Sequence, residues 1–458
     1  MTEPILTETA TQRAPCKFPT DFVFATLEQA GVRYALLRGY DELLNAPADV
    51  EIDLLVHRDD LLLLARTVAG LGFVETPAWG HAPHRFFVAF STELGVWIKL
   101  DVVTELYYGH PFRHLRLKLV GACLRQRRHE DVYLLSEEHE FLTLLLHCLL
   151  DKGRFDEKHR LRLRQLAARL REDLHLRARL GNLVQKFLSP AIDWPFIAKV
   201  LESDVWQELL HHRTALAHHL LRRARLSCVT KIITTSLARR LRPVFFMLRR
   251  HGVATVLLAP DGAGKSTLAK SLMRDKHLRA RLVYMGTNIE ARTVGLPLTP
   301  VLSRKLKEIN QSNQRKTAMG LIIRCVNLVN TLAEHWYRCL YARYQLLRGR
   351  FVIFDRFIYD AWIQKRQKSG WKRLRRWLFD VACPEPDLVV LLDAPGEVLY
   401  ARKQEHSSEW IDQQRAGYHK LSDSLPQMVI VDASQSAEAV RKEVTGLIWR
   451  RYGHGAMK

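Results

Sequence analysis

The stretch Val253–Thr267, VATVLLAPDGAGKST, decides the fold of the second half of the chain. Its first six residues are apolar or β-branched, which predicts a buried strand that runs into a glycine-rich loop and then a helix. Gly262 and Gly264 let backbone N–H groups turn around phosphate oxygens, and the helix N-terminus adds a partial positive charge. Ala259–Ser266 therefore predicts a nucleotide-phosphate loop, with alanine in place of the usual first glycine. The alternative is a surface glycine turn that carries a lysine.

The loop residues have separate expected roles. We expect Lys265 to reach the β- and γ-phosphates of ATP and the Ser266 hydroxyl to ligate Mg²⁺. The predicted nucleotide-binding residues are Asp261, Gly262, Ala263, Gly264, Lys265, Ser266 and Thr267.

Three later apolar runs also end in aspartate. They are Phe351–Phe354 before Asp355, Leu388–Leu392 before Asp393, and Met428–Val431 before Asp432. A long amphipathic helix is expected from about Gln314 to Leu347. Strands that alternate with helices predict an α/β fold with a parallel sheet covered on both faces. Ligands bind at the carboxyl ends of such strands.

The C-terminal half resembles the thymidylate kinase-like branch of the P-loop nucleoside-monophosphate kinases. The motifs that carry the resemblance, in matching order, are PDGAGKST (260–267), FVIFDRF (351–357), PDLVVLLDAP (386–395), YARKQE (400–405) and QRAGY (414–418). The resemblance implies that Asp355 orients Mg²⁺ and that Arg356 grips the acceptor phosphoryl group. It also implies that Arg402 and Lys403 cover the transferring phosphate, and that Asp261 lies near the acceptor sugar. A helix-start salt bridge is the alternative for Asp355 and Arg356.

The acceptor segment departs from that family. Thymidylate kinases carry an Arg-Glu-Pro-Gly-Gly-Thr segment after the first helix, where this chain reads LVYMGTNIEARTVG (282–295). We therefore expect a phosphorylated or sugar-containing small molecule other than dTMP as the acceptor. Divergent relatives of this kind are associated with bacterial surface-polysaccharide gene clusters.

Three acidic residues in the N-terminal part form a second candidate site. Glu51 and Asp53 are two apart in EIDLLV, so both point to one face of a strand, and Asp101 lies on another predicted strand. Such a set of carboxylates can hold the metal ions of nucleotidyl transfer. The alternative is that Glu51 and Asp53 are solvated and that Asp101 pairs with Lys99.

This N-terminal part resembles the uncharacterised branch of the nucleotidyltransferase superfamily. The resemblance rests on the turn Arg38-Gly39, the strand Glu51-Ile52-Asp53, the helix end Leu71-Gly72-Phe73 and the helical stretch HEFLTLLLHCLLDKG (139–153). Arg-Gly-Tyr replaces the usual Gly-Ser, the first acid is Glu, and Ala69 replaces a leucine. The resemblance implies a small α/β domain with a helical extension.

Five segments are predicted along the chain. They are a flexible tail (1–19), a nucleotidyltransferase-like α/β domain (20–130), a helical extension (131–208), a basic amphipathic linker (209–251) and a thymidylate kinase-like domain (252–458). Pro243 is expected to end or kink the linker helix. Lys158-His159-Arg160 is either a phosphate contact or an exposed helix start.

The net charge is strongly positive. Lys and Arg number 70 against 48 Asp and Glu, a formal charge of +22. Three runs without acidic residues, 113–129, 211–251 and 361–379, supply most of this excess. The charge indicates a phosphorylated substrate or an anionic membrane surface as partner. Dedicated nucleic-acid binding is disfavoured, because the chain has no zinc finger, basic zipper or RNA-binding signature.

The cysteines and the hydropathy bear on location. Seven cysteines (16, 123, 148, 228, 325, 339 and 383) lie far apart, which excludes a CxxC metal site and disfavours a disulfide framework. No apolar run reaches ~18 residues, and the N-terminus lacks a secretory signal. We expect a cytoplasmic protein, with peripheral attachment to the inner face of the membrane and homodimer formation left open. A non-catalytic, ATP-binding partner of a surface-polysaccharide assembly is a further alternative.

Overall fold

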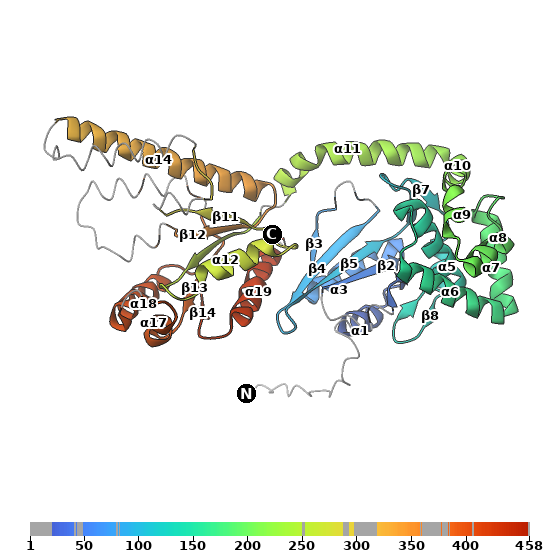
Figure 1. The fold of residues 1–458 in the computed structure, drawn as a ribbon, viewed down its shortest axis with the longest axis horizontal. Coiled ribbons are helices and arrows are strands. Elements are labelled where there is room, and N and C mark those ends of the chain that lie inside the picture. The colour runs from blue at the N-terminus through green and yellow to red at the C-terminus, as the bar shows by residue number, and fades with distance from the viewer. Residues whose placement is uncertain are drawn as a thin grey trace, which may run out of the picture. The chain divides into compact units, whose positions relative to one another are not determined.

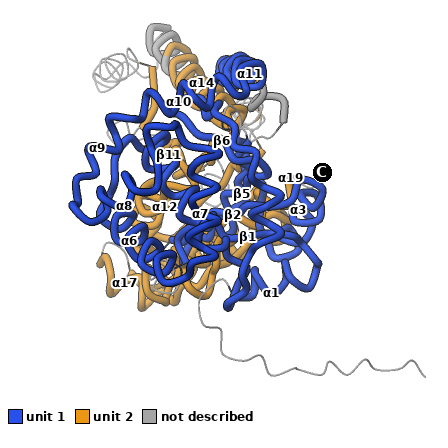
Figure 2. The backbone as a smooth tube through the Cα atoms, turned by 90° about the vertical axis from the view of Figure 1, so that its right-hand side faces the viewer, with its two compact units in different colours: residues 1–89, 96–242 blue, residues 90–95, 243–458 orange. Residues whose placement is uncertain are grey.

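The computed structural model describes residues 21–40, 43, 49–78, 81, 83–249, 252–286, 293–296, 318–357, 359, 377, 383, 385–404 and 407–456. The predicted tail 1–19 and, except for Trp377, the basic run 361–379 lie outside them. The chain folds into two compact units, unit 1 (residues 1–89 and 96–242) and unit 2 (90–95 and 243–458), which are coloured separately in Figure 2.

Unit 1 contains a mixed seven-stranded sheet in the order β3-β4-β5-β2-β1-β9-β8 (Figure 1). Its central strands β2 and β5 are parallel, and Asp53 lies directly beside Asp101. The strands are β1 (Tyr34–Arg38), β2 (Val50–Val56), β3 (Val74–Thr76), β4 (Arg85–Ser91), β5 (Val96–Val103), β8 (Arg128–His129) and β9 (Tyr133–Leu134), and a separate hairpin pairs β6 (Leu106–Tyr108) with β7 (Leu115–Leu117). The predicted strand that carries Glu51 and Asp53 is confirmed as β2, and the predicted strand that carries Asp101 is confirmed as β5.

Alternate residues of these strands enter two different cores. Leu36 and Ile52 pack with helices α1 (Asp21–Gln29) and α3 (Leu61–Gly70). The short 3₁₀ turn η1 (Arg58–Asp60) directly precedes α3 along the chain. Leu37 and Leu55 join the core formed by the helices that follow the sheet. Those helices are α4 (Val120–Arg125), α5 (Glu137–Leu146), the π-helical η2 (His147–Lys152), α6 (Glu157–Glu172), α7 (Leu174–Phe187), α8 (Trp194–Ser203), α9 (Trp206–His211) and α10 (Arg213–Arg223).

The predicted linker is helical, and of the two outcomes expected at Pro243, a helix end or a kink, the structure excludes the end. Helix α11 (Arg225–Arg249) runs through Pro243, so the proline does not end it. A proline removes only one backbone hydrogen bond, and the turns before and after it keep theirs.

Unit 2 is built on five parallel strands in the order β11-β12-β10-β13-β14. The strands are β10 (Ala254–Leu258), β11 (Arg281–Tyr284), β12 (Val352–Asp355), β13 (Leu388–Asp393) and β14 (Met428–Asp432). The predicted parallel α/β sheet is confirmed, with Asp355, Asp393 and Asp432 at strand ends. The central strand β10 is fully buried and leads directly into the phosphate loop.

Helices cover both faces of this sheet (Figure 1). On one face, Cys339 and Ala342 of α14 (Ala318–Leu347) and Tyr418 of α18 (Ser408–Ser422) pack against the strands. On the other, α12 (Lys265–Arg274) contacts β10 and packs against α19 (Ala437–Ala456). Helix α17 (Gly396–Lys403) packs against α18. The sheet edge that carries the aspartates therefore lies beside the start of α12.

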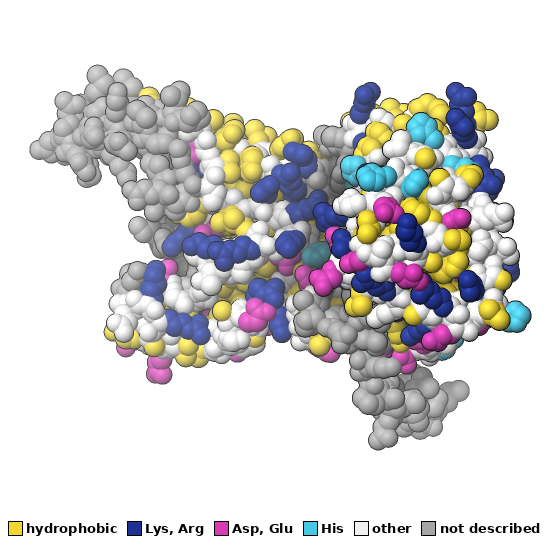
Figure 3. Space-filling model, turned by 45° about the vertical axis from the view of Figure 1, so that its right-hand side comes forward, with side chains coloured by type: hydrophobic (Ala, Val, Ile, Leu, Met, Phe, Trp, Pro, Cys, Tyr) yellow, Lys and Arg dark blue, Asp and Glu magenta, His cyan; other side chains and the backbone are white. Residues whose placement is uncertain are grey.

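Two observations bear on the charge and on membranes. On the face shown in Figure 3, Lys and Arg side chains occur in several groups with acidic and hydrophobic side chains among them. Among the described residues, none of the helices is both long enough and apolar enough to cross a bilayer.

Candidate functional site

The loop between β10 and α12 has the backbone of a phosphate cradle. Gly262 and Gly264 have φ angles of 88° and 85°, in the left-handed region that favours glycine. Gly264 is the N-cap of α12, so the N–H groups of the first turn of this helix are not used inside it. Ser266 and Thr267 in that turn are exposed. The loop can therefore receive an anion.

A second constraint acts on Gly262. A Cβ atom at this position would lie 2.7 Å from the carbonyl oxygen of Leu399 in α17. Only glycine lets the loop lie against this helix. The Tyr418 hydroxyl of α18 also donates to the carbonyl oxygen of Ala259, at 3.3 Å. Helices α17 and α18 thus hold the loop in position.

The predicted residues Lys265 and Asp355 are brought together. Lys265 Nζ lies 2.8 Å from Asp355 Oδ1, and both side chains are 14% exposed. The lysine comes from the first turn of α12, and the aspartate ends β12, the strand next to β10. The structure thus places a cation and a carboxylate together at the mouth of the loop.

Arg356 follows with an unusual backbone. Its φ angle is 61°, a left-handed conformation that costs a non-glycine residue about 1–2 kcal/mol. Its guanidinium Nη2 lies 3.6 Å from Asp261 Oδ1 of the loop. Strained residues of this kind cluster at functional sites. The exposed Arg356 side chain is therefore directed to the phosphate loop rather than along a helix.

Arg402 is held at the carboxyl end of β14, whereas Arg356 follows β12. It lies in the last turn of α17, and its guanidinium donates to the carbonyl oxygens of Ala433, at 2.8 Å, and Ser434, at 3.4 Å. These two residues follow the end of β14. In this structure Arg402 therefore joins α17 to the carboxyl end of β14.

Asp393, Arg415 and His419 form a cluster that no site prediction included. The Arg415 guanidinium donates two hydrogen bonds to the Asp393 carboxylate, at 2.8 and 3.0 Å, and His419 Nε2 lies 3.0 Å from it. Burial alone would raise the pKa of Asp393, but the hydrogen bonds from Arg415 and His419 outweigh it and lower the pKa. The signal was present in the sequence, because Asp393 ends a strand as Asp355 does.

A buried ion pair on α14 holds the segment after β11. Arg338 and Glu334 are 2.8 Å apart, each side chain 7% exposed. Arg338 donates to the carbonyl oxygens of Tyr284 and Gly286, each at 3.0 Å, and Glu334 accepts from the N–H of Leu296. Tyr284 and Gly286 belong to the segment 282–295, where the acceptor is expected, and Leu296 directly follows that segment. No local sequence pattern indicates that Arg338 and Glu334 hold this segment, since α14 and the segment after β11 are far apart along the chain.

The three N-terminal carboxylates also come together, in unit 1. Within Glu51, Asp53 and Asp101, one carboxylate oxygen of each residue lies within 4.8 Å of the others. Each already has a positively charged or histidine neighbour at 2.6 Å: Lys99 for Glu51, Arg38 for Asp53 and His84 for Asp101. The alternative pairing of Asp101 with Lys99 is wrong, because the Asp101 side chain contacts His84 and the Lys99 side chain contacts Glu51.

Asp53 and Asp101 line a pocket of unit 1. Burial would lower the pKa of Arg38 there, but the charge of Asp53 and its hydrogen bond outweigh burial and raise it. The pocket extends to the end of α5 and the start of the β6–β7 hairpin, and its polar lining includes Arg38, Asp53, His84, Asp101, Tyr108, Arg113 and Asp151. It is therefore a polar cavity with both signs of charge.

Lys158-His159-Arg160 lies at the start of helix α6, but not all three residues are exposed. His159 in the first turn of α6 is buried, and burial together with Lys152 and His147 lowers its pKa to about 4. The histidine is therefore neutral at physiological pH.

Comparison with known proteins gives a family match in unit 2. Residues 260–444 match the family model of thymidylate kinase. They form a thymidylate kinase-like domain. The match begins in the phosphate loop and ends in α19, so it includes Lys265, Asp355 and Arg402.

Curated relatives carry the same description. The chain is 28% identical over 211 residues to a probable thymidylate kinase of Thermococcus gammatolerans, covering 43% of this chain and 96% of that protein. It is 28% identical over 201 residues to a thymidylate kinase of Symbiobacterium thermophilum, covering 41% and 88%. The solved thymidylate kinase of Candida albicans is 19% identical with a TM-score of 0.31, over 44% of this chain and 94% of that one.

Proposed function

We propose that this chain is an ATP-dependent phosphotransferase of the nucleoside-monophosphate kinase type. The observation that carries the proposal is the 2.8 Å contact between Lys265 and Asp355 beside the left-handed glycines of the loop. The match of residues 260–444 to thymidylate kinase supports it. A cation for the phosphates and a carboxylate for a metal ion then stand at one sheet edge, as phosphoryl transfer requires.

Each group has a separate task in this proposal. The loop N–H groups and Lys265 bind the β- and γ-phosphates. Ser266 and Asp355 offer the hard oxygen ligands that suit Mg²⁺, which would neutralise charge on the phosphates. Without nucleotide, Lys265 and Asp355 neutralise each other. A bound phosphate gives Lys265 a doubly charged partner and frees an Asp355 oxygen.

Arg356 and Arg402 are the two guanidinium groups proposed to act on the phosphates. Arg356 reaches the loop from the end of β12 and would grip the acceptor phosphoryl group, aligning it for transfer. Arg402 would leave its carbonyl partners after β14 and neutralise the charge that develops on the transferred group.

The proposed acceptor is a phosphorylated or sugar-containing small molecule other than dTMP. The segment 282–295 lacks the family's acceptor motif. In its described part, Arg338, which is paired with Glu334, donates to the carbonyl oxygen of Tyr284. The missing motif favours a different acceptor.

An acceptor screen tests the proposal. The full chain is incubated with Mg²⁺, γ-labelled ATP and a panel of dTMP, other nucleoside monophosphates, sugars and lipid-linked sugars. Wild type and Lys270→Ala, an exposed lysine of the same helix, are expected to label one acceptor class, and Lys265→Ala at least about 10³-fold more slowly. Equal rates in the two variants would exclude the phosphate loop as the site of transfer.

A second candidate function is nucleotidyl transfer in unit 1. The carboxylates of Glu51, Asp53 and Asp101, within 4.8 Å of one another, favour it because they are the ligand type that a divalent metal requires. In that case Asp53→Asn abolishes pyrophosphate release from a nucleoside triphosphate, while Lys265→Ala retains it. Pyrophosphate release that survives Asp53→Asn would exclude these carboxylates.

A location at an anionic membrane face has its own support. Cys228 and Thr235 of α11 are buried, and Arg239 donates to the carbonyl oxygen of Pro111. The opposite face is apolar and exposed: Leu226, Val229, Ile233, Leu237 and Leu241. An apolar stripe flanked by basic residues suits peripheral binding to a membrane surface, and it equally suits the alternative role as a non-catalytic partner at that surface.

Vesicle binding tests this location. We expect salt-sensitive binding of the chain to anionic vesicles, and loss of this binding in the double variant Leu226→Glu/Ile233→Glu. Binding by that double variant would contradict the proposal.

A further inference from the structure

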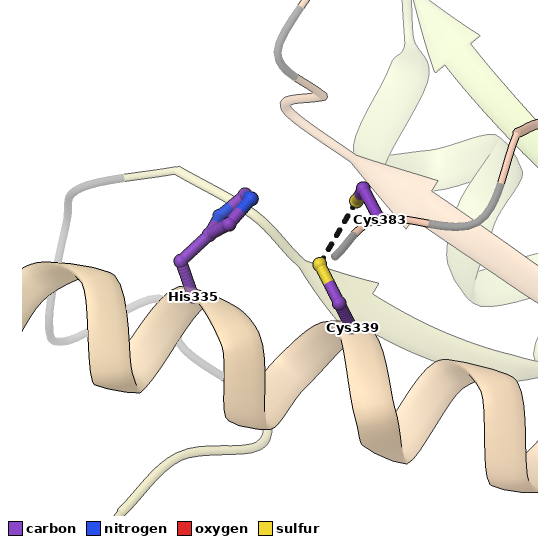
Figure 4. A group of neighbouring side chains, drawn as sticks. All are labelled: His335, Cys339 and Cys383. Carbon is purple, nitrogen blue, oxygen red and sulfur yellow. Dashed lines mark hydrogen bonds between the residues drawn. The ribbon is translucent and has the colours of Figure 1, made fainter. Parts of the chain in front are cut away.

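Three side chains with metal-binding atoms meet beneath the sheet of unit 2. His335 and Cys339 are one turn apart on α14, and Cys383 comes from the chain that precedes β13 (Figure 4). One ligand atom from each lies within 4.8 Å of the other two, and the two Sγ atoms are 2.9 Å apart. His335 is 6% exposed and Cys339 is fully buried. The imidazole edge and both sulfurs thus face one point inside the domain.

The donor set selects the ion. Two thiolates and one imidazole are soft and borderline donors, which suit Zn²⁺ and not the Mg²⁺ that serves phosphates. We propose that His335, Cys339 and Cys383 bind one Zn²⁺ ion. The site is separate from the phosphate loop and does not depend on the proposed phosphotransferase activity.

The distances fit a tetrahedral ion after a small adjustment. With Zn–S of about 2.3 Å and Zn–N of about 2.0 Å, two thiolates lie about 3.8 Å apart and a thiolate and an imidazole about 3.5 Å apart. The sulfurs must therefore separate by about 0.9 Å from their present 2.9 Å. Cys339 and Cys383 lie on different segments, so a small side-chain rotation achieves this. Water or an anion completes the fourth position.

The protonation balance is simple. Zn²⁺ binding removes one proton from each cysteine thiol, and these two protons go to solvent. His335 binds through the lone pair of its neutral ring. Two thiolates cancel the charge of the ion, so with water in the fourth position the buried centre is neutral and avoids the cost of a buried net charge.

The ion would join two parts of the domain that are distant in sequence. Helix α14 leads into β12 and Asp355, whereas Cys383 precedes β13. A link between Cys339 and Cys383 would therefore close the part of the chain that contains Asp355 and Arg356. The expected role is to stabilise unit 2, because the folded state binds the ion and the unfolded chain lacks the assembled site.

Cobalt substitution tests the proposal with the full-length chain. Protein reduced and stripped with a chelator is titrated with Co²⁺, whose tetrahedral thiolate complexes show strong visible bands and a near-ultraviolet thiolate charge transfer. One equivalent is expected to give both signals, and one equivalent of Zn²⁺ to abolish them. The carboxylates of unit 1 offer only oxygen, so they cannot produce the thiolate signal.

Matched variants locate the site. Cys339→Ser and Cys383→Ser are expected to lose the thiolate signal, and His335→Ala to weaken binding by more than the roughly 10- to 100-fold that loss of an outer-shell partner costs. Cys325→Ser, an exposed cysteine of the same helix, is the control and should bind like wild type. Circular dichroism reports whether each variant folds. If a variant does not fold, the Co²⁺ titration of the wild-type chain still tests the proposal.

Two results would overturn the proposal. One is a wild-type titration without a thiolate signal, or a signal that persists in both serine variants. The other is a Cys339–Cys383 disulfide, found by peptide mass spectrometry in protein kept in millimolar reduced glutathione, because oxidised cysteines cannot ligate the ion.

Discussion

At the scale of single residues, Gly262 and Gly264 share a left-handed backbone but differ in surroundings. A Cβ at Gly262 meets the Leu399 carbonyl oxygen at 2.7 Å, whereas one at Gly264 meets no atom within 4 Å. Gly264→Ala should lower the unfolding free energy of unit 2 by about 1 kcal/mol, from backbone strain alone. Gly262→Ala should lose about 1–3 kcal/mol more, because a backbone carbonyl must move. Denaturant unfolding without nucleotide measures both, and equal losses would show that the contact with α17 is unimportant.

The buried His159 gives unit 1 a pH dependence. Its pKa of about 4 lies below the ordinary value, so below about pH 6.5 the unfolded chain takes up a proton that the folded chain does not. Stability is therefore expected to fall as pH drops from about 6.5 towards 4. Unfolding midpoints between pH 7.5 and 5 should fall less steeply in His159→Gln than in wild type. His175→Gln, at an exposed histidine of α7, serves as the control, and identical slopes in all three proteins would refute the assignment.

At the scale of elements, a bidentate ion pair joins α18 to the end of β13. Arg415→Ala breaks two hydrogen bonds to the mostly buried Asp393 and should cost about 1–3 kcal/mol of unit 2 stability. Arg441→Ala removes a comparable two-bond pair with the exposed Glu438 on α19 and should cost less than about 1 kcal/mol. Chemical denaturation of the two variants compares them directly. A larger loss for Arg441→Ala would mean that burial does not set the strength of these pairs.

The elements themselves were largely predictable. The apolar runs before Asp355, Asp393 and Asp432 all became parallel strands. The first two strands, β12 and β13, are buried, as their continuous apolar residues predict. The third, β14, lies at the sheet edge and leaves Ile430 exposed. The glycine-rich loop between a strand and a helix was predictable because its backbone conformation depends on consecutive residues. Of the two effects expected of Pro243, a helix end or a kink, the end does not occur, since one missing hydrogen bond does not end a helix of 25 residues.

Contacts between distant segments were not predictable from local patterns. Asp393 with Arg415, and Glu334 with Leu296, are brought together only by the order of strands and the packing of helices. The same applies to His335, Cys339 and Cys383, since widely spaced cysteines give no spacing signal. Glu51, Asp53 and Asp101 were predictable as a cluster because two of them share a strand, but the partners of each were not.

At the scale of the whole chain, each unit has its own hydrophobic core, so we expect two unfolding transitions. Mg²⁺ with ATP at about 100 times its dissociation constant should stabilise unit 2 by about 2.7 kcal/mol, and unit 1 little. Calorimetry gives the midpoints, and hydrogen–deuterium exchange at β10 and β2 assigns each transition. Protection of β2 without protection of β10 would place the nucleotide in unit 1 instead.

The fate of each phosphate of ATP tests the central claim most directly. Single-turnover reactions with the full chain and its acceptor are run in parallel with γ-labelled and α-labelled ATP. The account predicts that the γ-label enters the acceptor with release of ADP, that Lys265→Ala abolishes this, and that Asp53→Asn leaves it unchanged. Transfer of the α-label with release of pyrophosphate, intact in Lys265→Ala and lost in Asp53→Asn, would contradict it.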